Sequence, residues 1–187
     1  MIQIHNNFLP EDVFHRLQAY SQQRDFQIVK LGDKEFSILP IPEEVLPFLQ
    51  IPGHELFLSF LRSANHDFDT DLRIHADNTI EGSKTTFASV LYVNSSDGVS
   101  ENGTCFWKHK DYGVELPSDI TNEEFDRLIV EDSNDISKWE RLDKVTSVPN
   151  KLVAYKSNLF HSKWPKRINK GERIVLVSFY RSVTNIE

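Results

Sequence analysis

The feature that most constrains the fold is a series of short apolar runs between Asp71 and Arg181. The runs are rich in Val, Ile, Leu, Tyr and Phe, and clusters of Gly, Asn, Asp and Ser separate them, as is typical of β-strands joined by turns. In chain order they are LRIHA, TTFASVLYV, TCFWKH, KLVAY, NLFHS and RIVLVSFY. At least six short strands in succession favour a barrel or a jelly roll.

Before Asp71 the pattern favours helices. After a short N-terminal strand, residues 10–23 carry apolar side chains at helical spacing, with a proline in the first turn. A second segment, residues 54–64 (HELFLSFLRSA), also fits an amphipathic helix. We therefore expect residues 1–70 to form a helical lead-in that buttresses a mainly β jelly-roll core at residues 71–181.

One insertion interrupts the strands at about residues 116–144. Thr121 and Glu124 form the pattern of a capping box, which predicts a helix from there to about Val130. The whole chain has 187 residues, a length that suits one domain and can bury one core. We expect a single domain over residues 1–187.

Composition narrows the class of protein. The first residues, MIQIHNNFLPEDVF, lack a basic segment followed by an apolar one, and no run of about 20 apolar residues is present. We expect a soluble, cytoplasmic protein without a membrane partner. Cys105 is the single cysteine, so the chain can form neither an internal disulfide nor a cluster of thiolate ligands. A metal ion would have to be held by His and carboxylate side chains.

Charge is distributed unevenly. The net charge is −7, which argues against broad nucleic-acid binding, yet residues 150–181 hold eight Lys and Arg against one acid, Glu172. Such a stretch can mark a face that meets an anion, but we favour the interpretation that it is a solvated basic loop on an acidic protein.

Two copies of the pattern His-x-Asp are candidates for a metal site. Non-haem iron enzymes hold Fe(II) with two imidazoles and one carboxylate, often as His-x-Asp followed by a distant His. His75 and Asp77 end a predicted strand, whose alternation can aim both side chains the same way. His109 and Asp111 are followed by too few strands to enclose a site. We favour the first copy, and we interpret the four earlier histidines as core or surface residues: His5, His15, His54 and His66.

Three later residues extend this candidate site. His161, in the run NLFHS, offers the second imidazole. Arg173 opens the last predicted strand, and a guanidinium there suits a carboxylate because it makes two parallel hydrogen bonds. Tyr92 offers a hydroxyl from the strand after the metal loop, although core packing is the competing interpretation.

The order HADN, ASVLYVN, GTCFW, LVAYKSNLFHS and GERIVLVSFY resembles the Fe(II)- and 2-oxoglutarate-dependent oxygenase superfamily, closest to its prolyl-hydroxylase-like branch. The chain is also similar to a group of bacterial and phage oxygenase-like proteins that share the stretch G-T-x-F-[WY]-x-H. The resemblance implies a double-stranded β-helix, Fe(II), 2-oxoglutarate and O2. It implies that His75, Asp77 and His161 bind iron and that Arg173 and Tyr92 hold the far carboxylate of 2-oxoglutarate.

The resemblance also leaves choices open. The gap between His161 and Arg173 is longer than usual for the family, so Arg167 is a rival anchor. The presence of Asp77 disfavours halogenases, which lack this carboxylate. Asn78 is either a hydrogen-bonding neighbour of the metal site or a turn residue.

The substrate is the least constrained element. We expect hydroxylation of a peptidyl or small-molecule substrate with release of succinate and CO2. The alternatives are a nucleic-acid-modifying oxygenase, suggested by the basic stretch beside Trp164, and a non-catalytic jelly-roll binding module. Loops at residues 78–84, 112–144 and 162–170 would surround the mouth, and four nearby side chains could form a recognition surface or simply pack: Trp107, His109, Trp139 and Trp164.

Overall fold

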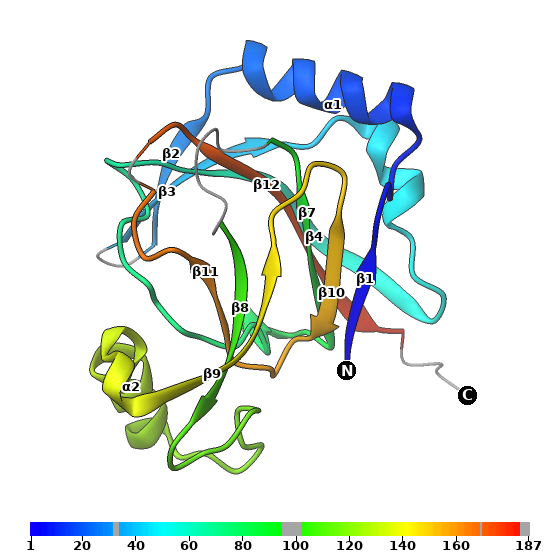
Figure 1. Ribbon diagram of the computed structural model, residues 1–187. Helices are drawn as coiled ribbons and strands as arrows, with labels where there is room; N and C mark the ends of the chain where they lie inside the picture. Colours follow the sequence, from blue (N-terminus) through cyan, green and yellow to red (C-terminus); the bar gives the residue numbers. More distant parts are fainter. Residues whose placement is uncertain (32–33, 95–101, 169, 184–187) are drawn as a thin grey trace.

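The computed structural model describes residues 1–31, 34–94, 102–168 and 170–183. Most of its elements are strands, and two sheets face each other (Figure 1). The strands are β1 (Ile2–His5), β2 (Gln27–Leu31), β3 (Lys34–Pro40), β4 (His54–Ala64), β5 (Thr79–Ile80), β6 (Ser83–Lys84), β7 (Phe87–Tyr92), β8 (Gly103–His109), β9 (Trp139–Thr146), β10 (Leu152–Lys156), β11 (His161–Trp164) and β12 (Arg173–Ser182). The helices are α1 (Glu11–Gln23), α2 (Asn122–Val130) and the 3-10 turns η1 (Glu43–Leu49), η2 (Asp132–Asn134) and η3 (Ile136–Lys138).

The large sheet has the strand order β1-β10-β7-β12-β4-β3-β2, and the small sheet has the order β11-β8-β9. All pairings within them are antiparallel. In the large sheet Val175 of β12 lies opposite Tyr92 of β7 on one side and Arg62 of β4 on the other. Because directly paired residues share a face, these three side chains and Arg173, two positions earlier, all lie on one face of the sheet.

Two apolar layers explain this arrangement. On the outer face, Val13 and Leu17 of α1 pack against residues such as Leu61 and Leu176 of the sheet. On the inner face, Val90, Val175 and Val177 pack with Tyr155 and with Phe106 from the small sheet. The large sheet is therefore covered on both sides, and the space between the sheets is filled by side chains. The fold is a mainly β jelly roll, as the succession of strands predicts.

A third apolar cluster lies beneath the insertion. Leu128 of α2 packs there with Trp107, Trp139 and Phe160. The Thr121 hydroxyl oxygen accepts from the amide of Glu124, and the Glu124 carboxylate accepts from the amide of Thr121, so the predicted capping box and helix are confirmed. The end of the insertion differs from the prediction, because β9 begins at Trp139 and pairs with β8.

The predicted helix at residues 54–64 is wrong, because this segment is strand β4. β4 lies between β12 and β3, and its two faces pack against different neighbours. A strand with apolar contacts on both faces reads as a continuous apolar run, which is easily mistaken for a helix. The helical lead-in is corrected accordingly: β2, β3 and β4 join the large sheet, and α1 and η1 are the helices of residues 1–70 in the described part of the chain.

The predicted strand LRIHA is wrong, because the segment forms only a single bridge, between His75 and His161, and the φ of +44° at Arg73 interrupts an extended backbone. Among the residues that the structure describes, no helix is both long and apolar enough to span a membrane.

Candidate metal centre

The backbones of His75 and His161 are joined directly. The amide of His75 donates to the carbonyl of His161 at 3.0 Å, and the amide of His161 donates to the carbonyl of His75 at 2.9 Å. Two residues on, the amide of Asp77 donates to the carbonyl of Ser157 at 2.6 Å, and the hydroxyl of Thr85 donates to the carbonyl of Asp77. Main-chain bonds therefore hold the His-x-Asp segment against the start of β11.

The three side chains converge at this point. Nε2 of His75 lies 3.3 Å from one carboxylate oxygen of Asp77, and Nε2 of His161 lies 3.1 Å from the other. One ligand atom from each residue lies within 4.8 Å of the others, so the three can hold one metal ion. Two imidazoles and one carboxylate are the ligand set of non-haem Fe(II) sites.

Each imidazole is oriented by a main-chain carbonyl. Nδ1 of His75 lies 2.8 Å from the carbonyl of Arg73, and Nδ1 of His161 lies 2.9 Å from the carbonyl of Leu159. A carbonyl can only accept, so each Nδ1 carries the proton and each Nε2 has a lone pair directed at Asp77. Fixing the ring through its other nitrogen is the usual way in which proteins prepare a metal-binding histidine.

Protonation states also suit a cation. Burial lowers the pKa of His75, and the neighbouring His161 lowers it further, which favours the neutral imidazole. Burial acts to raise the pKa of Asp77, but the neighbouring imidazoles of His161 and His75 outweigh burial and hold the pKa far below its ordinary value. Asp77 is therefore ionised over the whole neutral range.

Tyr155 also reaches this centre, and the sequence did not single it out. Its hydroxyl lies 3.0 Å from Nε2 of His161 and 3.4 Å from Asp77 Oδ2. Burial and the charge of Asp77 raise the pKa of Tyr155 well above its usual value, so the hydroxyl stays protonated and can donate. One signal was available: Tyr155 alternates with Val153 in the run KLVAY, which places it on the inner face of the sheet.

A recess opens beside the three ligands. Its lining combines the triad with Tyr155, Thr104 and Arg173, with apolar residues of β7 and β12, and with Arg62, Arg73 and Lys163. Arg173 is 5% exposed, and its Nε has no hydrogen-bond partner among the residues that the structure describes. A buried guanidinium with an unused donor is costly unless an anion completes it, so this side of the recess suits an anionic ligand.

Tyr92 lies next to Arg173 but outside the lining of the recess. The Arg173 guanidinium lies 5.7 Å from the centre of the Tyr92 ring. The Tyr92 hydroxyl donates to Thr104 Oγ1 at 2.8 Å and approaches the Val145 carbonyl at 3.2 Å. In this structure Tyr92 supports two residues that line the recess, Arg173 and Thr104, and its direct contact with a ligand stays a prediction.

The rival residues lie elsewhere. Arg167 is exposed and is absent from the lining of the recess. His109 is fully buried, its Nε2 lies 3.2 Å from Asp132 Oδ2, and its Nδ1 accepts from the amides of Asp111 and Tyr112. Both ring nitrogens of His109 are therefore occupied by core contacts. Asn78 accepts a hydrogen bond from the amide of Thr85 through its carbonyl, a role in the local turn.

The aromatic residues near the predicted mouth mostly pack. Trp107 and Trp139 are buried, and their indole N–H groups donate to Ser162 Oγ at 3.0 Å and to the Asp132 carbonyl at 2.8 Å. His109 is buried with them. These three residues do not form a recognition surface; Trp164 is partly exposed, with Arg141 over its ring.

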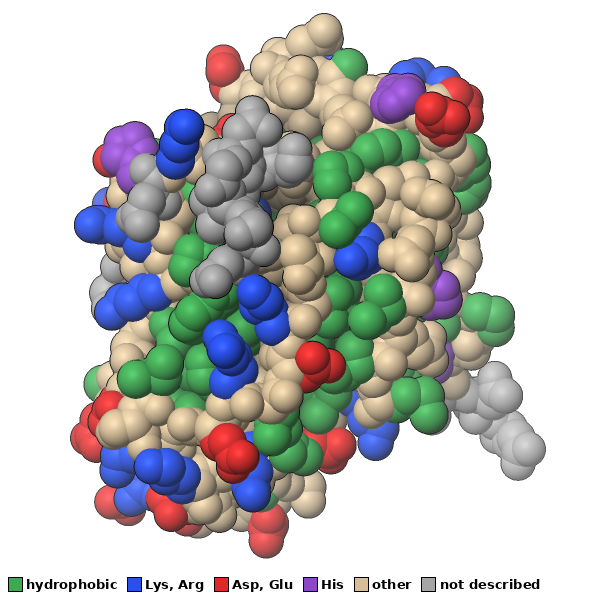
Figure 2. Space-filling model, in the orientation of Figure 1, with side chains coloured by type: hydrophobic (Ala, Val, Ile, Leu, Met, Phe, Trp, Pro, Cys, Tyr) green, Lys and Arg blue, Asp and Glu red, His purple; other side chains and the backbone are tan. Residues whose placement is uncertain are grey.

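Sequence reasoning missed two of the cations in the recess. Arg62 was hidden inside the segment taken for a helix, and Arg73 precedes His75 in the segment taken for a strand. Lys163 belongs to the basic stretch, and Figure 2 shows Lys and Arg side chains reaching the surface on the left of the view, near β11. Alternation along β11 would place Lys163 on the same side as His161.

No protein-family model matches the sequence, and no curated protein matches it. Solved structures do resemble the fold. A prolyl-4-hydroxylase from Pseudomonas putida superposes with a TM-score of 0.58 at 16% identity, covering 98% of this chain and 93% of that one. HygX from Streptomyces hygroscopicus, crystallised with nickel and 2-oxoglutarate, has a TM-score of 0.62 at 12% identity, covering 97% and 83%. The viral collagen prolyl hydroxylase of Paramecium Bursaria Chlorella virus-1, in complex with 2-oxoglutarate, has a TM-score of 0.52 at 10% identity, covering 98% and 96%. This likeness shows the fold.

Proposed function

We propose that the chain is an Fe(II)- and 2-oxoglutarate-dependent dioxygenase that hydroxylates a peptidyl or small-molecule substrate. The observation that carries this proposal is the convergence of His75, Asp77 and His161 beside the buried, incompletely bonded Arg173. A metal site alone fits many enzymes. A metal site that shares its recess with a deep guanidinium fits a co-substrate that chelates the metal at one end and carries a carboxylate at the other.

In this proposal each residue has a defined part. The two Nε2 atoms and the Asp77 carboxylate hold Fe(II), and the main-chain bonds at both Nδ1 atoms keep the rings in position. Arg173 pairs with the 5-carboxylate of 2-oxoglutarate. Tyr92 supports this end of the recess, because its ring lies beneath the Arg173 guanidinium and its hydroxyl donates to Thr104.

The bound iron and 2-oxoglutarate supply the oxidation, in which O2, 2-oxoglutarate and a C–H bond of the substrate give succinate, CO2 and an alcohol. The protein positions the reactants, and its apolar inner layer (Val90, Val175, Val177 and Phe179) keeps water from this side of the recess.

The substrate class rests on two supports. HygX has been crystallised with hygromycin B, a small molecule, and two of the other similar structures are prolyl hydroxylases. The second support concerns the basic stretch, residues 150–181. It gives the nucleic-acid alternative little support, because its cations contact different parts of the molecule. Lys163 and Arg173 line the recess, whereas Lys156 lies 3.8 Å from Glu115 and Arg181 pairs with Glu55 at 2.8 Å.

Co-substrate turnover tests the proposal. The protein supplied with Fe(II), 2-oxoglutarate and O2 should release succinate, slowly without substrate and faster with a substrate from a panel of peptides and small molecules. Arg173→Gln should raise the 2-oxoglutarate concentration needed for half-maximal succinate release by at least about 10-fold, because a charged hydrogen bond is worth roughly 1.5–3 kcal/mol. Arg167→Gln, a matched control on an exposed residue, should leave it unchanged. Absence of succinate under all these conditions would favour a non-catalytic binding module.

A further inference from the structure

Three cations besides Arg173 line the same recess, namely Arg62, Arg73 and Lys163. They come from separate parts of the chain: β4, the segment before His75, and β11. The proposed roles of the metal ligands and of Arg173 leave these three side chains unexplained.

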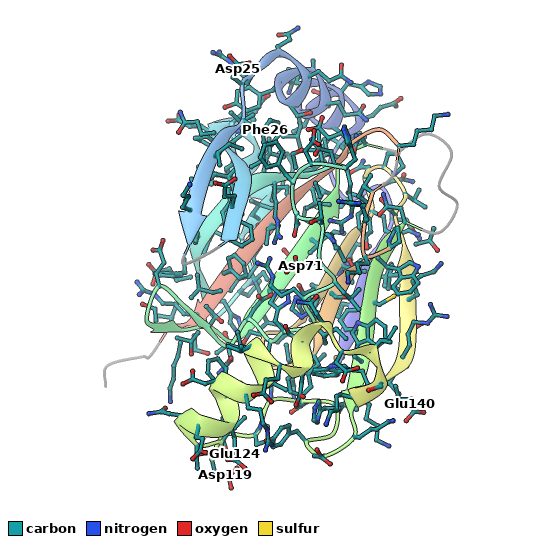
Figure 3. All side chains as sticks on the ribbon, turned by 90° about the vertical axis from the view of Figure 1, so that its left-hand side faces the viewer. Asp25, Phe26, Asp71, Asp119, Glu124 and Glu140 are labelled. Carbon is teal, nitrogen blue, oxygen red and sulfur yellow. The ribbon has the colours of Figure 1, made fainter. Side chains whose placement is uncertain are left out.

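The acids nearby do not balance them. Asp69 is buried between the two arginines, 2.5 Å from Arg62 and 4.0 Å from Arg73. The carbonyl of Asp71, which is labelled in Figure 3, accepts from the Lys163 ammonium at 2.5 Å, and its carboxylate is close enough to attract Arg73 and Lys163. Three cations against two carboxylates leave one positive charge. The metal centre offers nothing to offset it, since Fe(II), Asp77, Arg173 and the two charges of 2-oxoglutarate together sum to zero.

Phe36 of β3 holds the two arginines side by side. The guanidinium of Arg62 lies 4.8 Å from the centre of the Phe36 ring, and that of Arg73 lies 4.5 Å from it. The Nε of Arg62 is buried and finds no hydrogen-bond acceptor within the described residues. Stacking on an aromatic ring fixes both guanidiniums but does not neutralise them, and two like charges near one carboxylate remain costly without an anion.

Arg173 is buried more deeply than Arg62 and Arg73, and this difference in burial separates their roles. Arg173 is buried at the start of β12, as a residue that grips one end of a fully enclosed co-substrate would be. The side chains of Arg62 and Arg73 keep 20% and 16% of their surface exposed, so a second ligand can reach them from outside.

We propose that Arg62, Arg73 and Lys163 bind an oxyanion group, a carboxylate or a phosphate, on the primary substrate. The inference rests on the proposed function, because the bound molecule is a substrate only if the protein is an enzyme of that class. The enzyme is then selective for an acidic molecule whose charged group sits at this cluster and whose reacting carbon sits at the metal. Lys163 is two residues from His161 on β11, so the cluster lies within one small molecule's reach of the metal centre.

Binding of matched probes tests the inference. Protein loaded with Mn(II) and 2-oxoglutarate is titrated by calorimetry with benzoate, with phenyl phosphate and with uncharged benzamide. At least one of the two anions should bind about 10-fold more tightly than benzamide, and the stronger anion identifies the oxyanion. Arg73→Gln and, as a second variant, Arg62→Gln should remove about 10-fold of that affinity and leave 2-oxoglutarate affinity within twofold. Lys166→Gln, an exposed lysine outside the recess, should behave as wild type.

The other outcomes are distinct. Equal binding of benzamide and both anions, or anion binding that is the same in every variant, would overturn the inference. Loss of 2-oxoglutarate affinity in Arg73→Gln or Arg62→Gln would also overturn it, because the cluster would then belong to the co-substrate. If wild-type protein binds the anions through Arg73 but never binds 2-oxoglutarate, the proposed function fails and the anion site stands.

Discussion

The hydroxyl of Tyr155 lies 3.0 Å from Nε2 of His161, the ring nitrogen that faces Asp77. A metal ion at this nitrogen would leave Asp77 Oδ2, at 3.4 Å, as the hydroxyl's acceptor. Tyr155 would then orient the carboxylate through this hydrogen bond.

Tyr155→Phe should therefore weaken metal binding without removing it. Loss of a hydrogen bond to a ligand usually costs about 10- to 100-fold in metal affinity. Calorimetric titration with Mn(II) measures the change, and Tyr20→Phe, far from the centre on α1, is the matched control. An affinity for Mn(II) equal to wild type would show that Tyr155 only packs.

The two His-x-Asp copies should respond to substitution in opposite ways. His75→Ala should abolish tight Mn(II) binding and leave stability nearly unchanged, because main-chain bonds hold this segment. His109→Ala should leave Mn(II) binding intact. It should lower the free energy of unfolding by about 3 kcal/mol, because it leaves the buried carboxylate of Asp132 without the His109 imidazole. Urea denaturation and metal titration of both variants separate the two roles; metal loss in His109→Ala alone would reverse the assignment.

Gly103 marks a close approach of two backbones. A Cβ at this position would overlap the carbonyl oxygen of Val145 on the paired strand β9. Gly103→Ala should lower the free energy of unfolding by about 1–3 kcal/mol, since neither backbone can move freely. Gly82→Ala is a useful contrast: it has open space around the Cβ but a φ of +74°. Urea denaturation measures the change in the free energy of unfolding. A Gly103→Ala variant as stable as wild type would contradict the close approach of the two backbones.

Cys105 provides a pH-dependent measurement. Burial raises the pKa of the Cys105 thiol to about 11, whereas in an unfolded chain it is about 8.5. Between these values the unfolded state has released a proton that the folded state keeps, so stability falls as the pH rises through this window. From pH 8 to pH 10 the wild-type free energy of unfolding should fall by up to about 2 kcal/mol more than that of Cys105→Ala. Parallel pH profiles for the two proteins would contradict the buried thiol.

The predictions from sequence were most accurate where local pattern and tertiary structure agree. The runs TCFWKH, KLVAY and RIVLVSFY became β8, β10 and β12, and the capping box at Thr121 marked the start of α2. His75 and Asp77 of the favoured copy lie together with His161, because the backbones of His75 and His161 pair directly.

The remainder depended on contacts that no local pattern records. β4 could be recognised as a strand only through its pairing with β12 and β3. The position of Arg62, which lies on β4 opposite Val175, could be recognised only with it. The roles of Tyr155 and Arg73 follow from side-chain directions set by distant segments. The resemblance implies that Tyr92 and Arg173 hold the same carboxylate, and the two side chains are neighbours; the hydrogen bond from Tyr92 to Thr104 depends on where β8 lies.

The most direct test of the proposed function is anaerobic addition of Fe(II) and 2-oxoglutarate to the purified protein. Chelation of iron by the keto acid should produce a visible charge-transfer absorption that requires both components. The absorption should disappear in Asp77→Ala and in His161→Ala while their circular dichroism stays that of the folded protein. Absence of this absorption in wild-type protein, or its persistence in both variants, would contradict the assignment of His75, Asp77 and His161 as the iron ligands of a 2-oxoglutarate-dependent oxygenase.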